Sequence, residues 1–292
     1  YYKGDIMKYR FMRFPDGKTK AVTLSYDDGT KGDLRLAEIC NEHGIKCTFN
    51  LVSSFLERSG PNHLTVDEVK SNLLDCGHEV AVHTSMHAAP GSVSEIDGIS
   101  GVLDCRRYLE TAFNRIIRGM AYPDSGIGRL QNGVPYDNIK NYLQYLGIAY
   151  ARTLGGDNNS FLMPQDWYSW RPTCHHNNSK LFDWATEFVE IDVNKGYYDS
   201  RYPRLFYLWG HSHEFISKDN WNVLEHFCEI VSGHDDIWYA TNIEIYDYTM
   251  AYRRLQFSAN NTLVYNPTAV TLWFDIDGKL FSVKPNETVE LS

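Results

Sequence analysis

The sequence lacks long apolar segments and an excess of basic residues. No stretch of its 292 residues approaches the ~20 consecutive apolar residues that a membrane-crossing helix needs. Lys and Arg number 28 against 37 Asp and Glu, which gives a formal net charge of −9. An acidic balance argues against nucleic acid or an anionic membrane surface as the main partner. We therefore expect no membrane span and no nucleic-acid partner.

The sequence also lacks paired cysteines. Its six cysteines are scattered, and none stands in a Cys-x2-Cys pair. Most fall in helical patterns, so we expect packed free thiols and not a disulfide framework or a zinc cage. No signal-peptide pattern is present either, so we expect any targeting signal to have been removed or never to have existed, and the compartment cannot be read directly.

Short apolar runs alternate with amphipathic segments between residues 21 and 242. This order predicts a parallel sheet covered by helices, and at this length a distorted (β/α)7 barrel fits better than an open sheet. The predicted strands are Ala21–Tyr26, Cys47–Val52, Glu79–His83, Gly119–Pro123, Ile148–Thr153, Ser169–Pro172, Leu205–Trp209 and Ile237–Thr241. The predicted helices are Asp33–His43, Thr65–Cys76, Ser94–Phe113, Asp137–Leu146, Lys180–Phe188 and Trp221–Ser232.

The pattern changes after a long predicted helix, Asn242–Phe257. Residues 258–292 read as short strands separated by turns, with Asp277-Gly278 as a hairpin signal. We therefore divide the chain into a barrel over residues 1–257 and a small C-terminal β appendage over residues 258–292. No catalytic role is expected of the appendage.

Groups with catalytic chemistry follow several of the predicted strands. Because barrel active sites lie at the carboxyl ends of the strands, these groups are expected to meet at one face. They are Asp27, Asp28, His83, Pro123, Asp124, Arg152, Arg171 and His211.

The first predicted strand ends in Asp27-Asp28-Gly29. Adjacent side chains at a strand end diverge, so one carboxylate can bind a metal while the other faces an attacking water. Glycine lets the chain turn sharply and leaves room for a ligand. An ordinary Asp-Gly turn is the alternative, but two carboxylates at the end of a core strand need cations or donors nearby.

His83 and His87 follow the third predicted strand. Their i, i+4 spacing places both imidazoles on one face if the segment turns helically, and imidazole suits Zn²⁺ and similar divalent ions. Two structural histidines are the alternative. With one aspartate, the pair would make three protein ligands and leave a position for water, as a catalytic site requires.

His211 follows a further strand and can serve as a general acid. Near it, His213 and Glu214 can form hydrogen bonds or simply be solvated. An acidic residue such as Asp166 can orient the acid histidine, and Trp167 can wall an acyl pocket, although packing is the alternative for both. His175 and His176 are read as surface or rim residues.

These segments resemble the polysaccharide deacetylases, the NodB-homology group of carbohydrate esterase family 4. The resemblance rests on Leu24-Ser-Tyr-Asp27-Asp28-Gly29, on His83-Thr-Ser-Met-His87 and, more loosely, on Leu208-Trp-Gly-His211. It implies a catalytic base at Asp27, metal ligands at Asp28, His83 and His87, and an acid at His211. It also implies that the backbone N–H of Tyr122 or a neighbour stabilises the oxyanion, and it favours a secreted or periplasmic location.

One segment departs from the family pattern. Where the family carries an arginine that braces the base, this chain has Ala121, within Ala121-Tyr122-Pro123-Asp124. Arg152 and Arg171 are the candidates to replace it. We favour Arg152, because its predicted strand directly follows the strand that carries Ala121.

The sequence thus predicts a hydrolase that uses a divalent metal, with zinc as the default, to remove acetyl groups from a carbohydrate. An N-acetylated amino sugar is favoured as the substrate. A deacetylase of O-acetyl esters, as in acetylated xylan, is one alternative. A non-catalytic carbohydrate-binding barrel is another, although such a module would need neither the base nor the acid.

Overall fold

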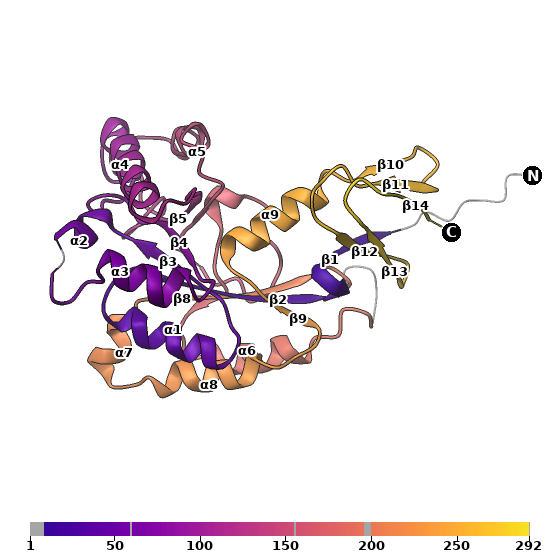
Figure 1. The fold of residues 1–292 in the computed structure, drawn as a ribbon, viewed down its shortest axis with the longest axis horizontal. Helices are drawn as coiled ribbons and strands as arrows, with labels where there is room; N and C mark the ends of the chain where they lie inside the picture. The colour runs from indigo at the N-terminus through magenta and orange to yellow at the C-terminus, as the bar shows by residue number, and fades with distance from the viewer. Residues whose placement is uncertain (1–8, 59, 155, 196–199, 292) are drawn as a thin grey trace, which may run out of the picture.

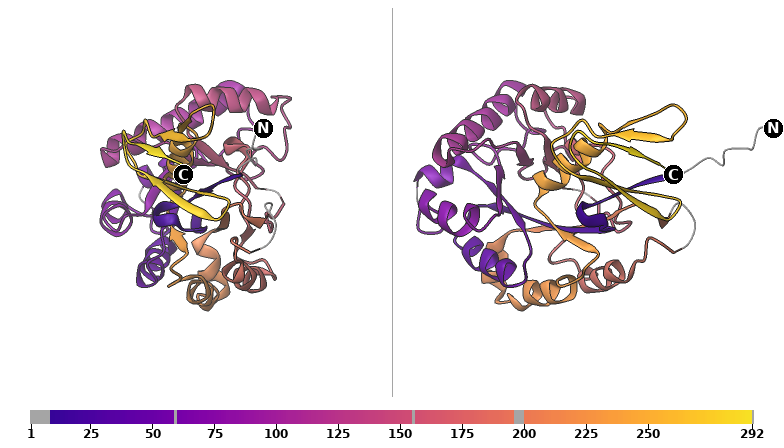
Figure 2. Two further views of the ribbon diagram at one scale, coloured as in Figure 1. Left: turned by 90° about the vertical axis from the view of Figure 1, so that its right-hand side faces the viewer. Right: turned by 45° about the vertical axis from the view of Figure 1, so that its right-hand side comes forward.

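The computed structural model describes residues 9–58, 60–154, 156–195 and 200–291. Its main sheet is parallel and follows the order β6-β5-β4-β3-β2-β8-β7. Curled and incompletely closed, it confirms the predicted distorted barrel of seven strands (Figures 1 and 2). The strands are β2 (Lys20–Asp28), β3 (Cys47–Leu51), β4 (Glu79–Val82), β5 (Gly119–Ala121), β6 (Tyr150–Arg152), β7 (Cys174–His175) and β8 (Arg204–Gly210).

Strand β2 is the centre of this sheet. It pairs with β3 along its second half and with β8 along most of its length, while β9 (Ile237–Tyr239) pairs with its first residues. Every residue from Lys20 to Asp27 is buried, as is typical of a parallel strand covered on both faces. The polar side chains among them have partners: Thr23 donates to Asn242 at 2.8 Å and Ser25 accepts from Asn50 at 2.7 Å.

Helices surround the sheet on its outer side (Figure 2). Their buried stripes, which include Leu36, Ile39 and Leu109, pack against the sheet in one large core. A capping box formed by Thr65 and Glu68 starts α3. The outer helices are α1 (Gly32–Glu42), α2 (Ser53–Arg58), α3 (Val66–Val69) with the π-helical η2 (Lys70–Leu74), α4 (Glu95–Phe113), α5 (Tyr136–Tyr145), α6 (Leu181–Glu190), α7 (Ser212–Lys218) and α8 (Asn222–Val231).

The C-terminal β region consists of two small antiparallel sheets, of order β1-β12-β13 and β10-β11-β14. It follows α9 (Asn242–Tyr252), which ends earlier than predicted, and includes β10 (Gln256–Phe257), β11 (Leu263–Tyr265), β12 (Leu272–Ile276), β13 (Lys279–Val283) and β14 (Thr288–Glu290). Its remaining strand, β1 (Arg10–Arg13), comes from the other end of the chain. The region is therefore not built from residues 258–292 alone, although the domain boundary itself stays a prediction.

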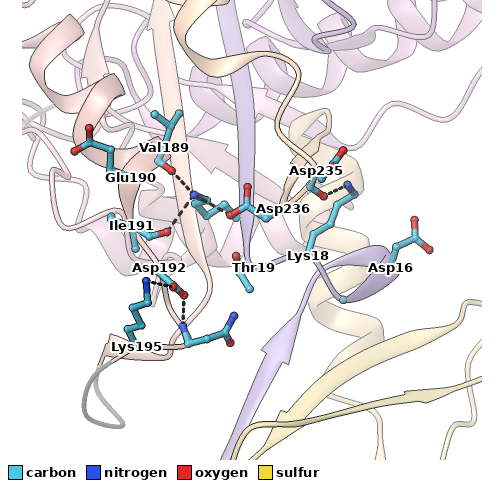
Figure 3. A pocket seen from close by; sticks show the side chains of 13 residues that line it. Asp16, Lys18, Thr19, Val189, Glu190, Ile191, Asp192, Lys195, Asp235 and Asp236 are labelled. Atoms are coloured by element: carbon cyan, nitrogen blue, oxygen red, sulfur yellow. Dashed lines mark hydrogen bonds and ion pairs between the residues drawn. The ribbon is translucent and has the colours of Figure 1, made fainter.

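These small sheets lie at the base of the barrel, where its strands begin (Figure 1). Only the short 3-10 helix η1 (Pro15–Gly17) and its flanking residues separate β1 from the start of β2. A cavity of about 590 Å³ opens at this base. Lys20 lies in its wall, where its Nζ donates to the carbonyl oxygens of Val189 and Ile191 and pairs with Asp236, three residues that Figure 3 labels. The base is thus the end opposite to the carboxyl ends of the strands.

The strand predicted at Ser169–Pro172 is wrong. Trp167–Ser169 forms a short 3-10 helix, η3, and the carboxylate of Asp166 caps it by accepting the N–H of Tyr168 at 2.9 Å. Trp170 forms only a single bridge with Arg152, and the paired strand β7 comes later, at Cys174–His175. The cap turns the chain locally and delays the start of the ladder.

All six cysteines lie in the described part of the chain as free thiols. Within the described ranges, no helix combines the length and the apolar character needed to cross a membrane.

Candidate metal centre and catalytic site

Asp28, His83 and His87 converge at the carboxyl end of the barrel strands. The Oδ1 atom of Asp28 lies 3.6 Å from His83 Nε2 and 3.2 Å from His87 Nε2. The two histidines meet through a bent loop and not through the helical turn that their spacing suggested. Thr84 and His87 both have positive φ, at 61° and 56°, and Thr84 Oγ1 accepts the N–H of Ala88 at 3.0 Å.

The chemistry of these three side chains fits a divalent cation. Asp28 Oδ1 is buried without a hydrogen-bond partner, so one anionic oxygen awaits a cation or donor. His83 Nδ1 lies 2.9 Å from the carbonyl oxygen of Ala121, which can only accept, so Nδ1 carries the proton and Nε2 offers its lone pair toward Asp28. Two imidazole nitrogens and one carboxylate are a common ligand set for catalytic zinc.

Electrostatics distinguish the two histidines. Burial lowers the pKa of His83, which keeps its ring neutral as a ligand must be. The close contact of its Nε2 with the Asp28 carboxylate, at 3.2 Å, raises the pKa of His87. Burial alone would raise the pKa of Asp28, but its contact with His87 and the proximity of His83 and His211 outweigh burial and hold this pKa below its usual range.

Asp27 lies beside this centre and is almost fully buried. Its Oδ2 lies 3.9 Å from His83 Nε2, and its Oδ1 accepts a hydrogen bond of 2.8 Å from Asn50 Nδ2. The guanidinium of Arg152 donates to Oδ2. These donors and the adjacent cation stabilise the ionised carboxylate.

Arg152 therefore lies where the sequence analysis expected a replacement for the missing arginine. Strands β5 and β6 are neighbours, and Ala121 is in register with Arg152. The Arg152 side chain is fully buried between Asp27 and Trp209, with its guanidinium carbon 4.5 Å from a ring centroid of Trp209. Arg171 is exposed and lines a different surface pocket together with Asp166.

His211 completes the group. It stands at the N-terminus of α7, directly after β8, and its Nε2 lies 3.9 Å from Asp27 Oδ2. Its Nδ1 lies 2.8 Å from Oε1 of Glu214. Burial would raise the pKa of Glu214, but the hydrogen bond from His211 and the nearby histidines lower it to about 2, so this carboxylate is charged.

Two expectations about the region before β7 are wrong. Asp166 does not contact His211; it accepts hydrogen bonds from Tyr136 and Lys140 at 2.9 Å each, and the carboxylate beside His211 is that of Glu214. Trp167 does not wall the site either. It packs against Trp170 and Tyr246 in the core between the sheet and α9.

The segment after β5 contributes less than expected. Tyr122 is buried, and its backbone N–H already donates to the carbonyl of Arg152 at 3.0 Å, so it does not serve an oxyanion. Pro123 has no N–H. Asp124 is exposed, with Oδ1 3.7 Å from His87 Nδ1, so it reaches the rim of the metal centre.

Sequence reasoning missed Asn50 and Trp209 and left Glu214 undecided. Asn50 could have been found, because it is a polar residue within the apolar strand Cys47–Leu51 and is in register with Asp27. Glu214 could have been favoured as well, since it lies one helical turn after His211.

Comparisons with known proteins are consistent with this geometry. Residues 15–150 match the family model described as polysaccharide deacetylase. A structure from Mycobacterium smegmatis, provisionally assigned as a polysaccharide deacetylase, is 16% identical with a TM-score of 0.55, and the match covers 85% of this chain and 96% of that one. The Puue allantoinase is 13% identical with a TM-score of 0.56, and the match covers 80% and 91% of the two chains.

Other comparisons are less extensive. The match to the Streptococcus pyogenes deacetylase PplD, at 19% identity and a TM-score of 0.41, covers 46% of this chain and spans only 55% of that protein. No curated protein matches the sequence. At their identities, the Mycobacterium smegmatis structure and the Puue allantoinase show a shared fold and no more. The match to the family model covers the segments that carry Asp27, Asp28, His83 and His87, and it confirms the resemblance that their motifs indicated: residues 15–150 are similar to the polysaccharide deacetylases.

Proposed function

We propose that this protein is a divalent-metal-dependent deacetylase of carbohydrates whose preferred substrate is an N-acetylated amino sugar. One observation carries the proposal. A three-ligand centre of Asp28, His83 and His87 lies next to a buried, arginine-paired Asp27 on one side and a carboxylate-paired His211 on the other. A base and an acid flanking a metal centre are the parts that acyl hydrolysis needs.

The residues divide the work as follows. A cation held by Asp28, His83 and His87 would polarise the acetyl carbonyl and make a water easier to deprotonate. Asp27 accepts the proton of the attacking water, and the guanidinium of Arg152, which donates to its Oδ2, holds the carboxylate in place. His211 delivers a proton from Nε2 to the leaving nitrogen as the carbon–nitrogen bond breaks. An amine is a poor leaving group without that proton, so the acid matters more for an amide than for an ester.

Charge supports the choice of substrate class. The chain has a net charge of −9, which suits a neutral polymer that becomes cationic on deacetylation better than an anionic one. The Puue allantoinase shares the fold and is named for a different substrate, so the fold alone leaves the substrate open and the assignment to sugars is our proposal.

Acetate release tests the proposal. Zinc-loaded protein should release acetate from N-acetylglucosamine oligomers faster than from acetylated xylan, and chelation should abolish the activity until zinc is restored. Asp27→Asn should retain zinc but lose roughly 10²–10⁴-fold in turnover. His83→Ala should lose zinc and activity together. Preference for the xylan ester would overturn the choice of an amide substrate, and absence of acetate from every substrate would overturn the enzyme assignment.

A further inference from the structure

Glu214 lies among three histidines on the side of His211 that faces away from the metal centre. Its Oε1 lies 2.8 Å from His211 Nδ1 and 3.2 Å from His175 Nε2, and its Oε2 lies 3.7 Å from His176 Nε2. By composition this cluster of His175, His176 and Glu214 resembles a second metal site.

The hydrogen bonds argue against a cation there. The backbone N–H of Asn177 donates to Nδ1 of His175 at 3.0 Å, so Nδ1 holds a lone pair and the proton of the neutral ring is on Nε2. His175 therefore presents an N–H to Glu214 and no free lone pair. His83 has the opposite arrangement, because its Nδ1 faces the carbonyl of Ala121. The cluster is built to hold a carboxylate with N–H donors.

We propose that Glu214 is the positioning residue for the acid histidine His211, and that His175 holds Glu214 in place; this inference rests on the proposed function. The Nδ1–H of His211 donates to Glu214, which leaves Nε2 pointing to the space beside Asp27. When Nε2 takes a proton, the resulting cation faces a carboxylate. When Nε2 gives that proton to the leaving nitrogen as the carbon–nitrogen bond breaks, the ring returns to its neutral Nδ1–H form.

Among the charged and titratable groups around His211, Glu214 is the one that contacts its Nδ1. Asp27, on β2, faces His211 Nε2 with its Oδ2 at 3.9 Å. The same oxygen pairs with Arg152, and Oδ1 accepts a hydrogen bond from Asn50. The rings of His175 and His213 have centroids 6.1 Å and 5.3 Å from that of His211. Asp28 acts on His211 only through its charge, and Lys218 lies 3.4 Å from Glu214 Oε2.

His176 has a different role. Its ring is almost fully buried and stacks on Phe215 at 4.1 Å and on Tyr26 at 5.7 Å, and neither ring nitrogen has a hydrogen-bond partner. Gly210 is required beside it, because a Cβ there would lie 2.0 Å from His176 Nδ1. His176 thus fills the wall behind Glu214 and does not orient it.

The test compares zinc-loaded variants by kinetics and by NMR of the imidazole rings. Glu214→Gln should lower kcat at least about tenfold with little change in KM, and should move the basic limb of the pH–rate profile down by about 1 pH unit, since the carboxylate that stabilises the protonated ring is gone. The NMR titration of His211 should move in the same direction.

Paired variants separate positioning from simple packing. His175→Leu should lower kcat about tenfold, and His175→Gln, whose amide can reach Glu214 as Nε2–H does, should restore most of it. His213→Gln is the matched control, since its ring is closer to His211 than that of His175, and it should change neither kcat nor the profile.

Two outcomes would overturn the inference: an unchanged His211 titration in Glu214→Gln, or equal losses in His175→Leu and His175→Gln. The NMR titration needs no turnover. If no substrate is hydrolysed, the proposed function fails while the role of Glu214 is still decided by the titration.

Discussion

At the scale of single residues, the base and its arginine form the contact that distinguishes this site. Asp27 is adjacent to a second carboxylate, Asp28, and like charges this close disfavour ionisation. The buried guanidinium of Arg152 offsets that repulsion, although it comes from a different strand than the arginine that the family pattern would supply.

Replacing Arg152 should therefore impair the base without removing the metal. Arg152→Met keeps much of the buried volume but removes the charge. We expect a lower kcat, because the Asp27 carboxylate loses a hydrogen-bond donor and the cation that balances its charge beside Asp28. Zinc content, measured by mass spectrometry, should stay unchanged.

Arg171→Met is the matched control, because Arg171 is exposed in another pocket. A kcat of Arg152→Met equal to that of the unmodified protein would contradict the role given to Arg152. A comparable loss of kcat in Arg171→Met would do the same.

The sequence was sufficient for some of these residues and not for others. Arg152 could be predicted because consecutive β/α units place their strands side by side, and Ala121 is indeed in register with it. Glu214 was left undecided beside Asp166, although its place one turn after His211 favours it if the segment is helical. Only the start of α7 decides between them, by bringing Glu214 back to His211 within one turn.

At the scale of elements, the N-terminus of α9 is fixed to the sheet by a buried carboxylate. Glu79 on β4 accepts hydrogen bonds from the N–H of Ile243 and from Thr48 Oγ1, both at 2.8 Å, and from Tyr150 O–H at 2.7 Å. Burial is the largest influence on this group and raises its pKa to about 7, despite the three donors.

This raised pKa predicts a loss of stability with rising pH. Below about pH 4.5 the Glu79 carboxyl is protonated in both folded and unfolded chains. Between about 4.5 and about 7 the folded chain binds more protons, so stability falls as pH rises, and above that window the folded state keeps a buried charge. The full effect is about 3 kcal/mol.

A comparison with Glu79→Gln isolates the effect, because all other titrations cancel between the two proteins. In urea unfolding, the free energy of unfolding of the variant, relative to that of the unmodified protein, should rise by about 3 kcal/mol between pH 4.5 and pH 8. A difference between the two proteins that is independent of pH would show that Glu79 does not titrate in this window.

Helices and strands were predictable where the periodicity of apolar residues within the segment decides the structure. β2 and the helices that follow β2, β4 and β5 lie where their apolar periods placed them. The strand at Ser169–Pro172 was wrong because the cap by Asp166 overrides the β propensity of the aromatic residues around it. The pairing of β1 with β12 could not be foreseen, since it joins segments from opposite ends of the chain.

At the scale of the whole molecule, the catalytic groups and the contacts that join the C-terminal β region to the barrel lie at opposite ends of the barrel. The candidate site is at the carboxyl ends of the strands, whereas the C-terminal β region and the cavity in Figure 3 are at the base. Lys20 links three segments there. Its Nζ donates to the carbonyl oxygens of Val189 at 2.6 Å and Ile191 at 3.1 Å, and lies 2.9 Å from Asp236 Oδ2.

Lys20→Met should therefore lower stability but leave catalysis intact. The Lys20 side chain is 1% exposed, so removing its ammonium group leaves two carbonyls without their donor and Asp236 without its cation. We expect a loss of about 1–3 kcal/mol in the free energy of unfolding, from the midpoint of urea unfolding at constant slope. Lys18 is an exposed neighbour that donates to the carbonyl of Asp235, and Lys18→Met should change the free energy of unfolding by about 0.5 kcal/mol or less.

For Lys20→Met below the unfolding transition, kcat per folded molecule should equal that of the unmodified protein, because the two ends of the barrel share no catalytic group. A fall in kcat that accompanies the loss of stability would mean that the base of the barrel adjusts the site, and it would contradict this separation of the two ends.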